Sequence, residues 1–159
     1  MDGPKEEQLP RTNIFDIINI IMNRLILFRG WPGSGKTQAA YRMFPGTFHI
    51  ENDMFHIHQG KYEWNKENMP KAILWCTETC KSALALGLDA VVCNTFTKRK
   101  FVEVYKKMAE EFGAEFHVYR CVGKFKNVHG LSEEMVARFE KVMEDWPGEI
   151  IVDSAEKLK

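Results

Sequence analysis

Residues 30–37 read Gly30-Trp31-Pro32-Gly33-Ser34-Gly35-Lys36-Thr37, which matches the pattern G-x-x-x-x-G-K-[ST]. The apolar run over residues 24–29 lies directly before this stretch and is typical of a buried parallel strand. A helix is predicted from Lys36 to about Phe44, where Pro45 and Gly46 would end it. Since the pattern lies between a predicted strand and a predicted helix, the sequence predicts a phosphate-binding loop here.

Each part of this loop has a physical role in holding a triphosphate. Gly33 and Gly35 permit backbone angles that other residues resist, so amide N–H groups can turn toward phosphate oxygens. The following helix adds unpaired N–H groups and partial positive charge. Lys36 is expected to reach the β- and γ-phosphates, and the Thr37 hydroxyl to ligate Mg²⁺. We therefore expect ATP and Mg²⁺ as cofactors, bound by Gly30, Gly33, Ser34, Gly35, Lys36 and Thr37.

The rest of the chain predicts strands that alternate with helices. Four more strands are predicted at residues 47–51, 89–93, 115–121 and 149–153. Three more helices are predicted at residues 68–86, 98–112 and 132–146, the last with Met135, Phe139, Val142 and Trp146 facing inward. This alternation implies a parallel sheet with helices on both faces. The expected fold class is α/β, a P-loop NTPase three-layer αβα sandwich with a mainly parallel five-stranded sheet and a small lid.

Length and composition limit the function classes. A chain of 159 residues suits one domain, which we place at residues 22–159 with the lid at about 122–132. Residues 1–21 are either an extension or part of the fold. The 22 basic residues balance the 22 acidic ones, so no overall charge favours duplex nucleic acid or a membrane. No apolar run is long enough to cross a bilayer and no secretory signal is evident, so a cytoplasmic location is expected.

Four cysteines are scattered along the chain at Cys76, Cys80, Cys93 and Cys121. No C-x-x-C pair or zinc spacing is present, so buried reduced thiols are favoured over a metal site. Asp53 follows the second predicted strand. From there a carboxylate can point toward the γ-phosphate and accept the proton of an acceptor hydroxyl, whereas a turn or helix-capping role fits the spacing equally well.

Several stretches resemble phage-type polynucleotide 5′-hydroxyl kinases and their AAA-type and zeta-toxin-like relatives in the wider P-loop kinase superfamily. These stretches are residues 29–37, 48–55, 91–97 and 127–132, and most of residues 23–153 can be laid along the pattern. The resemblance implies that Asp53 is the general base and that Asn94 and Thr95 contact the acceptor. It also implies that Lys126 of a mobile lid, with Lys124 and His129 nearby, supplies positive charge to the transferring phosphoryl group.

The chain departs from this pattern at three places. The relatives usually carry Asp-x-Thr-Asn where this chain has Cys93-Asn94-Thr95-Phe96, so an acid that could support the metal is lost, and Mg²⁺ would depend on Thr37, phosphates and water, with Asp53 as a further candidate. A lysine and Phe125 replace arginines of the lid, and lysine lacks the bidentate fork. His56 occupies an acceptor-side position where the polynucleotide kinases carry an arginine, which weakens the case for a nucleic-acid acceptor.

Other polar and aromatic residues allow two interpretations each. Tyr62 and Trp64, with Lys61 and Lys66 beside them, either stack on a base or pack their loop onto the core. The basic run at residues 98–100 either holds an anionic acceptor or forms a solvated helix face. By the resemblance, the adenine would lie near the lid and the segment around Asp153 and Ser154.

The leading hypothesis is an ATP- and Mg²⁺-dependent phosphotransferase. Its acceptor would be a hydroxyl of a nucleic acid, either at a 5′ end or on a modified base, with Lys36, Asp53 and Lys126 as catalytic residues and Asn94, Thr95 and His56 on the acceptor side. A small-molecule or nucleotide kinase is the alternative that the neutral charge balance favours. A catalytically degenerate nucleotide-binding module is the alternative that Cys93 favours. The sequence does not indicate an oligomeric state.

Overall fold

The computed structural model describes residues 13, 14, 22–126 and 130–153. Its centre is a sheet in the order β2-β5-β1-β6-β7, and every neighbouring pair is parallel. The strands are β1 (Arg24–Arg29), β2 (Phe48–Ile50), β5 (Ala90–Cys93), β6 (Glu115–Cys121) and β7 (Ile150–Val152). This sheet confirms the α/β fold class, and it places the strand that precedes the phosphate-binding loop in the middle.

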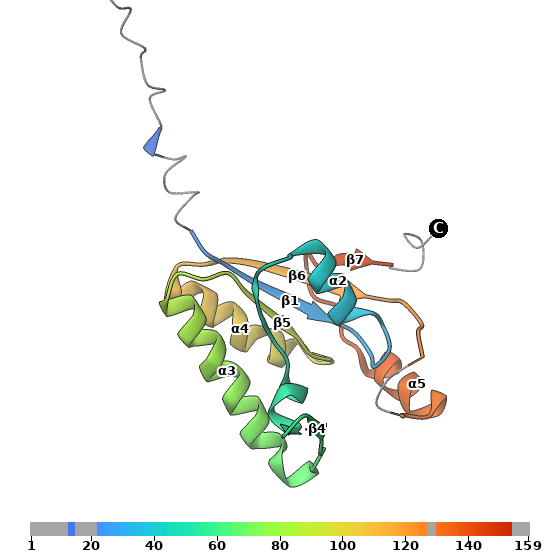
Figure 1. Cartoon of the computed structure of the whole chain (residues 1–159). Coiled ribbons are helices and arrows are strands. Elements are labelled where there is room, and N and C mark those ends of the chain that lie inside the picture. Colours follow the sequence, from blue (N-terminus) through green and yellow to red (C-terminus); the bar gives the residue numbers. More distant parts are fainter. Residues whose placement is uncertain (1–12, 15–21, 127–129, 154–159) are drawn as a thin grey trace, which may run out of the picture.

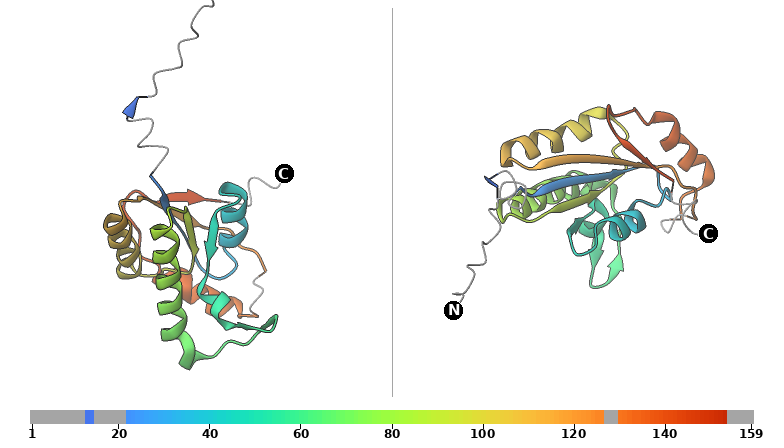
Figure 2. Two further views of the ribbon diagram at one scale, coloured as in Figure 1. Left: turned by 60° about the vertical axis from the view of Figure 1, so that its left-hand side comes forward. Right: turned by 90° about the horizontal axis from the view of Figure 1, so that it is seen from above.

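Helices cover both faces of the sheet, as Figures 1 and 2 show. Helices α3 (Met69–Ala85) and α4 (Arg99–Phe112) pack on one face, where Leu25 and Leu27 of β1 point. Helix α2 (Lys36–Met43) packs on the other face, against Ile26 and Phe28. The four side chains are all fully buried, which explains why the strand is a continuous apolar run.

Between β2 and α3 the chain makes a short excursion beyond the carboxyl end of the sheet. It consists of η1 (Asn52–His56), the antiparallel hairpin of β3 (Ile57–His58) and β4 (Lys61–Tyr62), and η2 (Lys66–Asn68). Gln59 and Gly60 form the hairpin turn, and both have positive φ angles, 49° and 77°. Figure 1 shows this hairpin beside the first turns of α3.

The last helix is shorter than its apolar pattern predicts. Helix α5 (Glu133–Val142) is capped by the Ser132 hydroxyl, but it ends before Trp146 and none of its residues is buried. Figure 2 shows the reason, because α5 lies at the carboxyl ends of the strands and not on a face of the sheet. Trp146 lies in the following turn and packs edge-on against Phe116. The prediction of an inward-facing stripe that runs to Trp146 is therefore wrong.

No helix in the described part of the chain is long and apolar enough to span a membrane. Residues 127–129 of the predicted lid, with His129, lie outside the described residues, as do Ser154 and most of the predicted extension over residues 1–21.

Candidate active site

The phosphate-binding loop has the backbone that its glycines were expected to allow. Gly30, Gly33 and Gly35 have φ angles of 153°, 78° and 90°. A Cβ atom on Gly30 would lie 2.4 Å from Ser34 Oγ and 2.6 Å from the carbonyl oxygen of Cys121, so any side chain there would collide with its surroundings. Gly35 is the N-cap of α2, so the loop leads directly into the N-terminus of a helix.

Two side chains of the loop, Lys36 and Ser34, offer hydrogen-bond donors to an anion. The Lys36 ammonium donates to the carbonyl oxygens of Gly30 and Trp31, at 3.1 and 3.0 Å. Burial lowers the pKa of Lys36, and the nearby charges of Glu51 and Asp53 oppose this shift. The buried Ser34 hydroxyl has no hydrogen-bond partner among the described residues. A phosphate group would give the Ser34 hydroxyl an acceptor and the Lys36 ammonium a negatively charged one. The loop therefore fits a nucleoside triphosphate.

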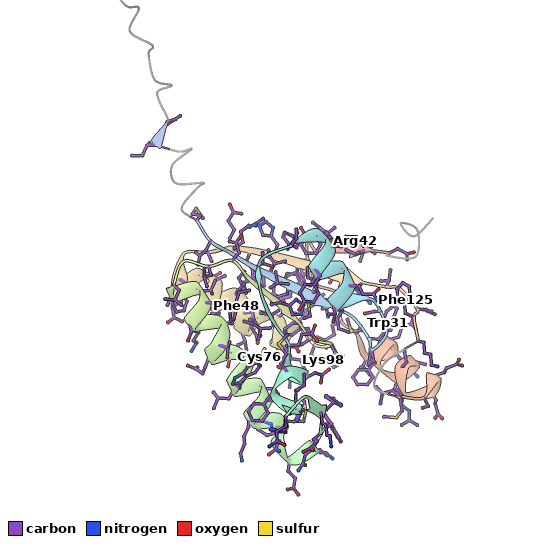
Figure 3. The ribbon with its side chains drawn as sticks, viewed as in Figure 1. Trp31, Arg42, Phe48, Cys76, Lys98 and Phe125 are labelled. Atoms are coloured by element: carbon purple, nitrogen blue, oxygen red, sulfur yellow. The ribbon has the colours of Figure 1, made fainter. Side chains whose placement is uncertain are left out.

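The segment that follows β6 is fastened to the outside of this loop. The amide of Gly123 donates to the Ser34 carbonyl at 3.2 Å, and the amide of Phe125 donates to the Gly33 carbonyl at 2.8 Å. The Trp31 indole donates to the carbonyl of Gly123 at 3.0 Å. Figure 3 shows Trp31 and Phe125 on the side of the loop that faces α5. Trp31 therefore shapes the loop, as its buried position also indicates.

The hydrogen bonds of Gly123 and Phe125 to the phosphate-binding loop fix the position of the first residues of the predicted lid. Lys126 is exposed and directly follows Phe125, whose amide binds the loop. Lys124 is also exposed, and its ammonium lies 3.7 Å from the carboxylate of Glu140 in α5. The structure thus brings Lys126 to the rim of the phosphate-binding loop, and its catalytic role stays a prediction.

Asp53 and the residues predicted to contact the acceptor follow strands that end at the same edge of the sheet. Asn52 and Asn94 bind each other twice, through the Asn52 amide and Asn94 Oδ1 at 2.9 Å and through Asn94 Nδ2 and Asn52 Oδ1 at 3.2 Å. This pair joins η1 to the loop after β5. The Thr95 carbonyl accepts from the amide of Gly30 at 3.2 Å. Asp53, Asn94 and Thr95 therefore belong to two neighbouring loops at the carboxyl end of the sheet, and their catalytic and acceptor-binding roles stay predictions.

His56 does not lie where the acceptor-side prediction placed it. Its side chain is 1% exposed, and the hairpin closes over it, with the Glu63 amide donating to the His56 carbonyl at 2.7 Å and the Tyr62 ring lying edge-on. Its two ring nitrogens have no hydrogen-bond partner among the described residues. In this conformation His56 presents no surface to an acceptor, so we correct its assignment from an acceptor contact to a residue buried under the hairpin.

Tyr62 of the hairpin and Trp64 just after it are more exposed than the packing interpretation expects. Tyr62 is 44% exposed and Trp64 55% exposed. The Tyr62 hydroxyl donates to Asp53 Oδ1 at 3.2 Å. Burial and the Asp53 charge raise the pKa of Tyr62 to about 12, so it acts as a donor at neutral pH. The hairpin thus contacts Asp53 and leaves aromatic surface open to solvent.

The basic start of α4 has acidic partners. Lys98 Nζ lies 3.3 Å from a carboxylate oxygen of Glu144, and the same carboxylate accepts from the Arg99 amide at 2.8 Å. Arg99 Nε donates to the Asp145 carbonyl at 2.6 Å. These contacts favour a structural role for Lys98 and Arg99 over capture of an anionic acceptor.

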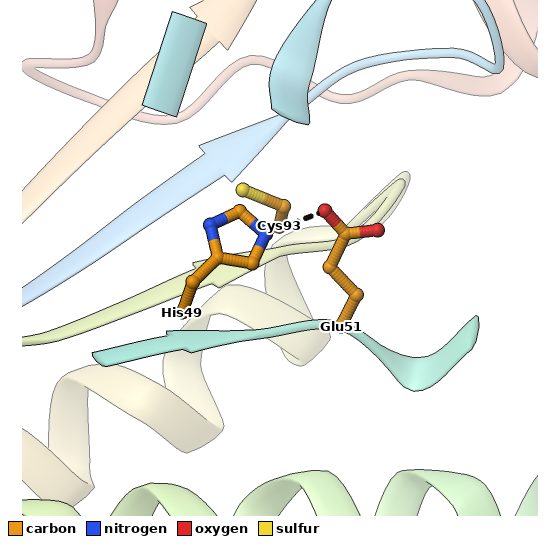
Figure 4. A group of neighbouring side chains, drawn as sticks. All are labelled: His49, Glu51 and Cys93. Carbon is orange, nitrogen blue, oxygen red and sulfur yellow. Dashed lines mark hydrogen bonds and ion pairs between the residues drawn. The ribbon is translucent and has the colours of Figure 1, made fainter. Parts of the chain in front are cut away.

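Glu51 and His49 were not singled out from the sequence, yet they lie against the phosphate-binding loop. Thr37 Oγ1 donates to Glu51 Oε1 at 2.7 Å, and His49 Nε2 lies 2.6 Å from the same oxygen. Figure 4 shows Cys93 beside them, and the ligand atoms of the three side chains lie within 4.8 Å of one another. The Tyr41 ring stacks on His49 at 4.3 Å. The alternation of residues 49 and 51 at the end of a strand is the signal that could have indicated them.

The ionisation of this cluster differs between its members. Burial acts to raise the pKa of Glu51, but hydrogen bonds from His49 and Thr37 and the Lys36 charge lower it on balance. Burial raises the pKa of the Cys93 thiol well above its ordinary value. The cluster therefore presents an ionised carboxylate beside a neutral thiol.

The comparisons with known proteins agree with this geometry. Residues 25–124 match the AAA domain family AAA_33, and the chain belongs to this family. The uncharacterized protein PM0531 of Pasteurella multocida (strain Pm70) is 28% identical over 131 residues, covering 72% of this chain and 73% of that protein.

Solved kinase structures share the fold. A sugar kinase from Janibacter sp. HTCC2649 is 18% identical with a TM-score of 0.58, covering 82% of this chain and 85% of that chain. A gluconokinase from Sinorhizobium meliloti 1021 is 15% identical with a TM-score of 0.57, covering 85% and 84%. A chain of the Pnkp1/Rnl/Hen1 complex is 14% identical with a TM-score of 0.55, covering 80% of this chain and 42% of that chain. The protein is thus a P-loop protein with a kinase-like fold.

Proposed function

We propose that the protein transfers the γ-phosphoryl group of ATP, with Mg²⁺, to a hydroxyl group of a nucleic acid. The observation that carries this proposal is the position of Asp53. The Asn52–Asn94 pair holds its turn at the edge of the sheet, and its charge acts on the Lys36 ammonium of the phosphate-binding loop. A carboxylate across from the phosphate cradle is the arrangement that phosphoryl transfer to a hydroxyl requires.

The reaction assigns a role to each of these groups. The acceptor oxygen forms a bond to the γ-phosphorus, the bond from that phosphorus to the bridging oxygen breaks, and ADP leaves with the electron pair. Asp53 accepts the hydroxyl proton. Lys36 and the amides of the loop neutralise the charge that develops on the phosphoryl oxygens, and Lys126 adds positive charge from the lid. When bound, Mg²⁺ would neutralise phosphate charge, and Thr37 would help to hold it.

The nucleic-acid acceptor is supported by the hairpin beside Asp53. Tyr62 and Trp64 expose aromatic surface there, with the exposed lysines Lys61 and Lys66 next to them. Aromatic rings stack on bases and lysines bind phosphates in single-strand sites. A chain of the Pnkp1/Rnl/Hen1 RNA repair complex also shares this fold, at a TM-score of 0.54 and 17% identity.

A small-molecule kinase is the second candidate. The sugar kinase and gluconokinase structures share the fold over most of their own length. The described part of the lid contains Lys124 and Lys126 but no arginine. This composition favours an acceptor that is smaller and less charged than a nucleic acid.

The experiment is transfer of labelled γ-phosphate to a panel of acceptors. The panel contains 5′-hydroxyl oligonucleotides, hydroxymethylated DNA, gluconate and simple sugars. We expect labelling of an oligonucleotide and its loss in Asp53→Asn, with ATP binding retained. The control is Glu78→Gln, because Glu78 is an exposed α3 residue paired with Lys81. Labelling of small molecules alone would refute the nucleic-acid acceptor, and no labelling by a protein that binds ATP would refute the kinase.

The hairpin gives a second test of the acceptor. Trp64→Ala should raise KM for an oligonucleotide by about 5- to 150-fold, because stacking on one base contributes about 1–3 kcal/mol. The same substitution should leave KM for ATP unchanged. An unchanged oligonucleotide KM would show that Trp64 does not contact the acceptor.

A further inference from the structure

Strand β5, which neighbours β1, ends without a carboxylate at the metal side of the site. In P-loop NTPases the Mg²⁺ ion is held by the loop Ser or Thr together with an acid. Strand β5 neighbours β1 and ends at Cys93, which brings a thiol to the loop. Mg²⁺ takes oxygen ligands, and thiols suit softer metals. Cys93 is therefore poorly suited to support Mg²⁺.

An acid reaches the same place from the next strand. Strand β2 pairs with β5 in parallel, with His49 opposite Val91 and Ile50 opposite Val92. Glu51 and Cys93 are the next residues along the two strands, and their carboxylate and thiol atoms lie within 4.8 Å of each other. The Glu51 carboxylate accepts the Thr37 hydroxyl at 2.7 Å, so a carboxylate oxygen and the hydroxyl expected to ligate Mg²⁺ are already in contact.

We propose that Glu51 is the carboxylate that supports Mg²⁺ in this site, supplied by β2 in place of an acid at the end of β5. The inference rests on the proposed function and assigns separate roles to two acids of one segment. Glu51 serves the metal beside Thr37, and Asp53 serves the acceptor beside Tyr62. His49 is a positioning residue, because its Nε2 lies 2.6 Å from Glu51 Oε1 and its ring is held by stacking on Tyr41.

The test measures metal binding and does not depend on turnover. Mn²⁺ is titrated into the full chain with ADP, and free Mn²⁺ is followed by electron paramagnetic resonance. Glu51→Gln should weaken Mn²⁺ binding about 10- to 100-fold, the usual loss when a group that supports a metal is removed. ADP binding without metal should stay within about threefold of wild type, because the loop is intact. Thermal melting of each variant verifies that it is folded.

A rescue variant makes the assignment specific. Adding Cys93→Asp to Glu51→Gln should restore at least about tenfold of the lost Mn²⁺ affinity, because the acid returns one strand away. Asp53→Asn and the surface control Glu78→Gln should each leave Mn²⁺ affinity within about threefold of wild type.

The outcomes separate this inference from the proposed function. A folded Glu51→Gln protein with unchanged Mn²⁺ affinity overturns the inference, and so does a loss confined to Asp53→Asn. Mn²⁺–ADP binding that depends on Glu51, in a protein that phosphorylates no acceptor, supports the inference and refutes the kinase. If the wild-type protein binds ADP equally with and without Mn²⁺, the protein does not hold the metal and the inference is wrong, whereas the labelling experiment alone decides the proposed function.

Discussion

A buried ion pair links the start of the phosphate-binding loop to the far edge of the sheet. Arg29, the last residue of β1, is fully buried, and its Nη1 donates to Glu149 Oε2 at 2.7 Å. Its Nε and Nη2 donate to the Phe96 carbonyl at 3.1 and 2.7 Å. Glu149 is itself 7% exposed and also lies 3.3 Å from Arg120. The pair is thus shielded from water, and it also contacts the loop at Phe96 and strand β6 at Arg120.

Glu149→Gln should destabilise the protein strongly. The substitution keeps the shape of the side chain but removes its charge, so the Arg29 guanidinium would remain buried without a carboxylate. Removing one partner of a buried pair costs about 3–5 kcal/mol. For a domain of this size, that loss corresponds to a fall in Tm of about 6–20 °C.

Asp145→Asn is the matched control. Asp145 also binds Arg120, but its side chain is 81% exposed. An exposed pair contributes about 0–1 kcal/mol, so this variant should melt close to wild type. Urea titration and thermal melting, both followed by tryptophan fluorescence, give the two free energies of unfolding. If the two variants differ from each other by less than about 1 kcal/mol, burial does not set the strength of this pair and the reasoning is refuted.

Three more predictions concern the site and the cysteines. Gly123→Ala should cost about 1–3 kcal/mol of stability and weaken ADP binding in a calorimetric titration, because the new Cβ would lie 2.8 Å from the Ser34 carbonyl oxygen. Tyr62→Phe should change kcat about tenfold or less at an unchanged Tm, because it removes an exposed hydrogen bond to Asp53. The four native cysteines should resist iodoacetamide at pH 8 in intact-mass measurements until urea is added, because burial raises the pKa of every thiol.

Much of the fold could be predicted from local patterns. The strand over residues 24–29 and the strand over residues 115–121 have the predicted bounds, and the helix that ends at Phe112 stops at Gly113 in a left-handed conformation, with φ 63°. These elements are specified by apolar runs and by glycine, which act over a few residues. The inward stripe of the last helix could not be predicted, because apolar spacing shows that a helix has one apolar side but not whether a sheet face is free to cover it.

The site was predictable where its chemistry lies within one segment. The phosphate-binding loop is contiguous, so its glycines, Lys36 and Thr37 could be named from the motif. The alternation of residues 49 and 51 could have drawn attention to Glu51, but not its contact with Thr37, because that contact arises from the pairing of β2 with β5 and the packing of α2. His56 was misplaced for a similar reason. Its burial is set by the hairpin that folds back over η1, which no spacing within residues 52–58 indicates.

The ion pair is connected to the loop after β5, which carries the proposed acceptor contacts, through one strained residue. Phe96 has a φ angle of 43°, which costs a bulky side chain about 1–3 kcal/mol and persists only where the surroundings enforce it. Arg29 holds the Phe96 carbonyl, and Tyr105 packs edge-on against its ring at 5.3 Å. The same loop carries Asn94, whose amide binds Asn52 next to Asp53. Loss of the Glu149 charge should therefore increase the mobility of the loop that carries Asn94 and Phe96 at temperatures below the Tm.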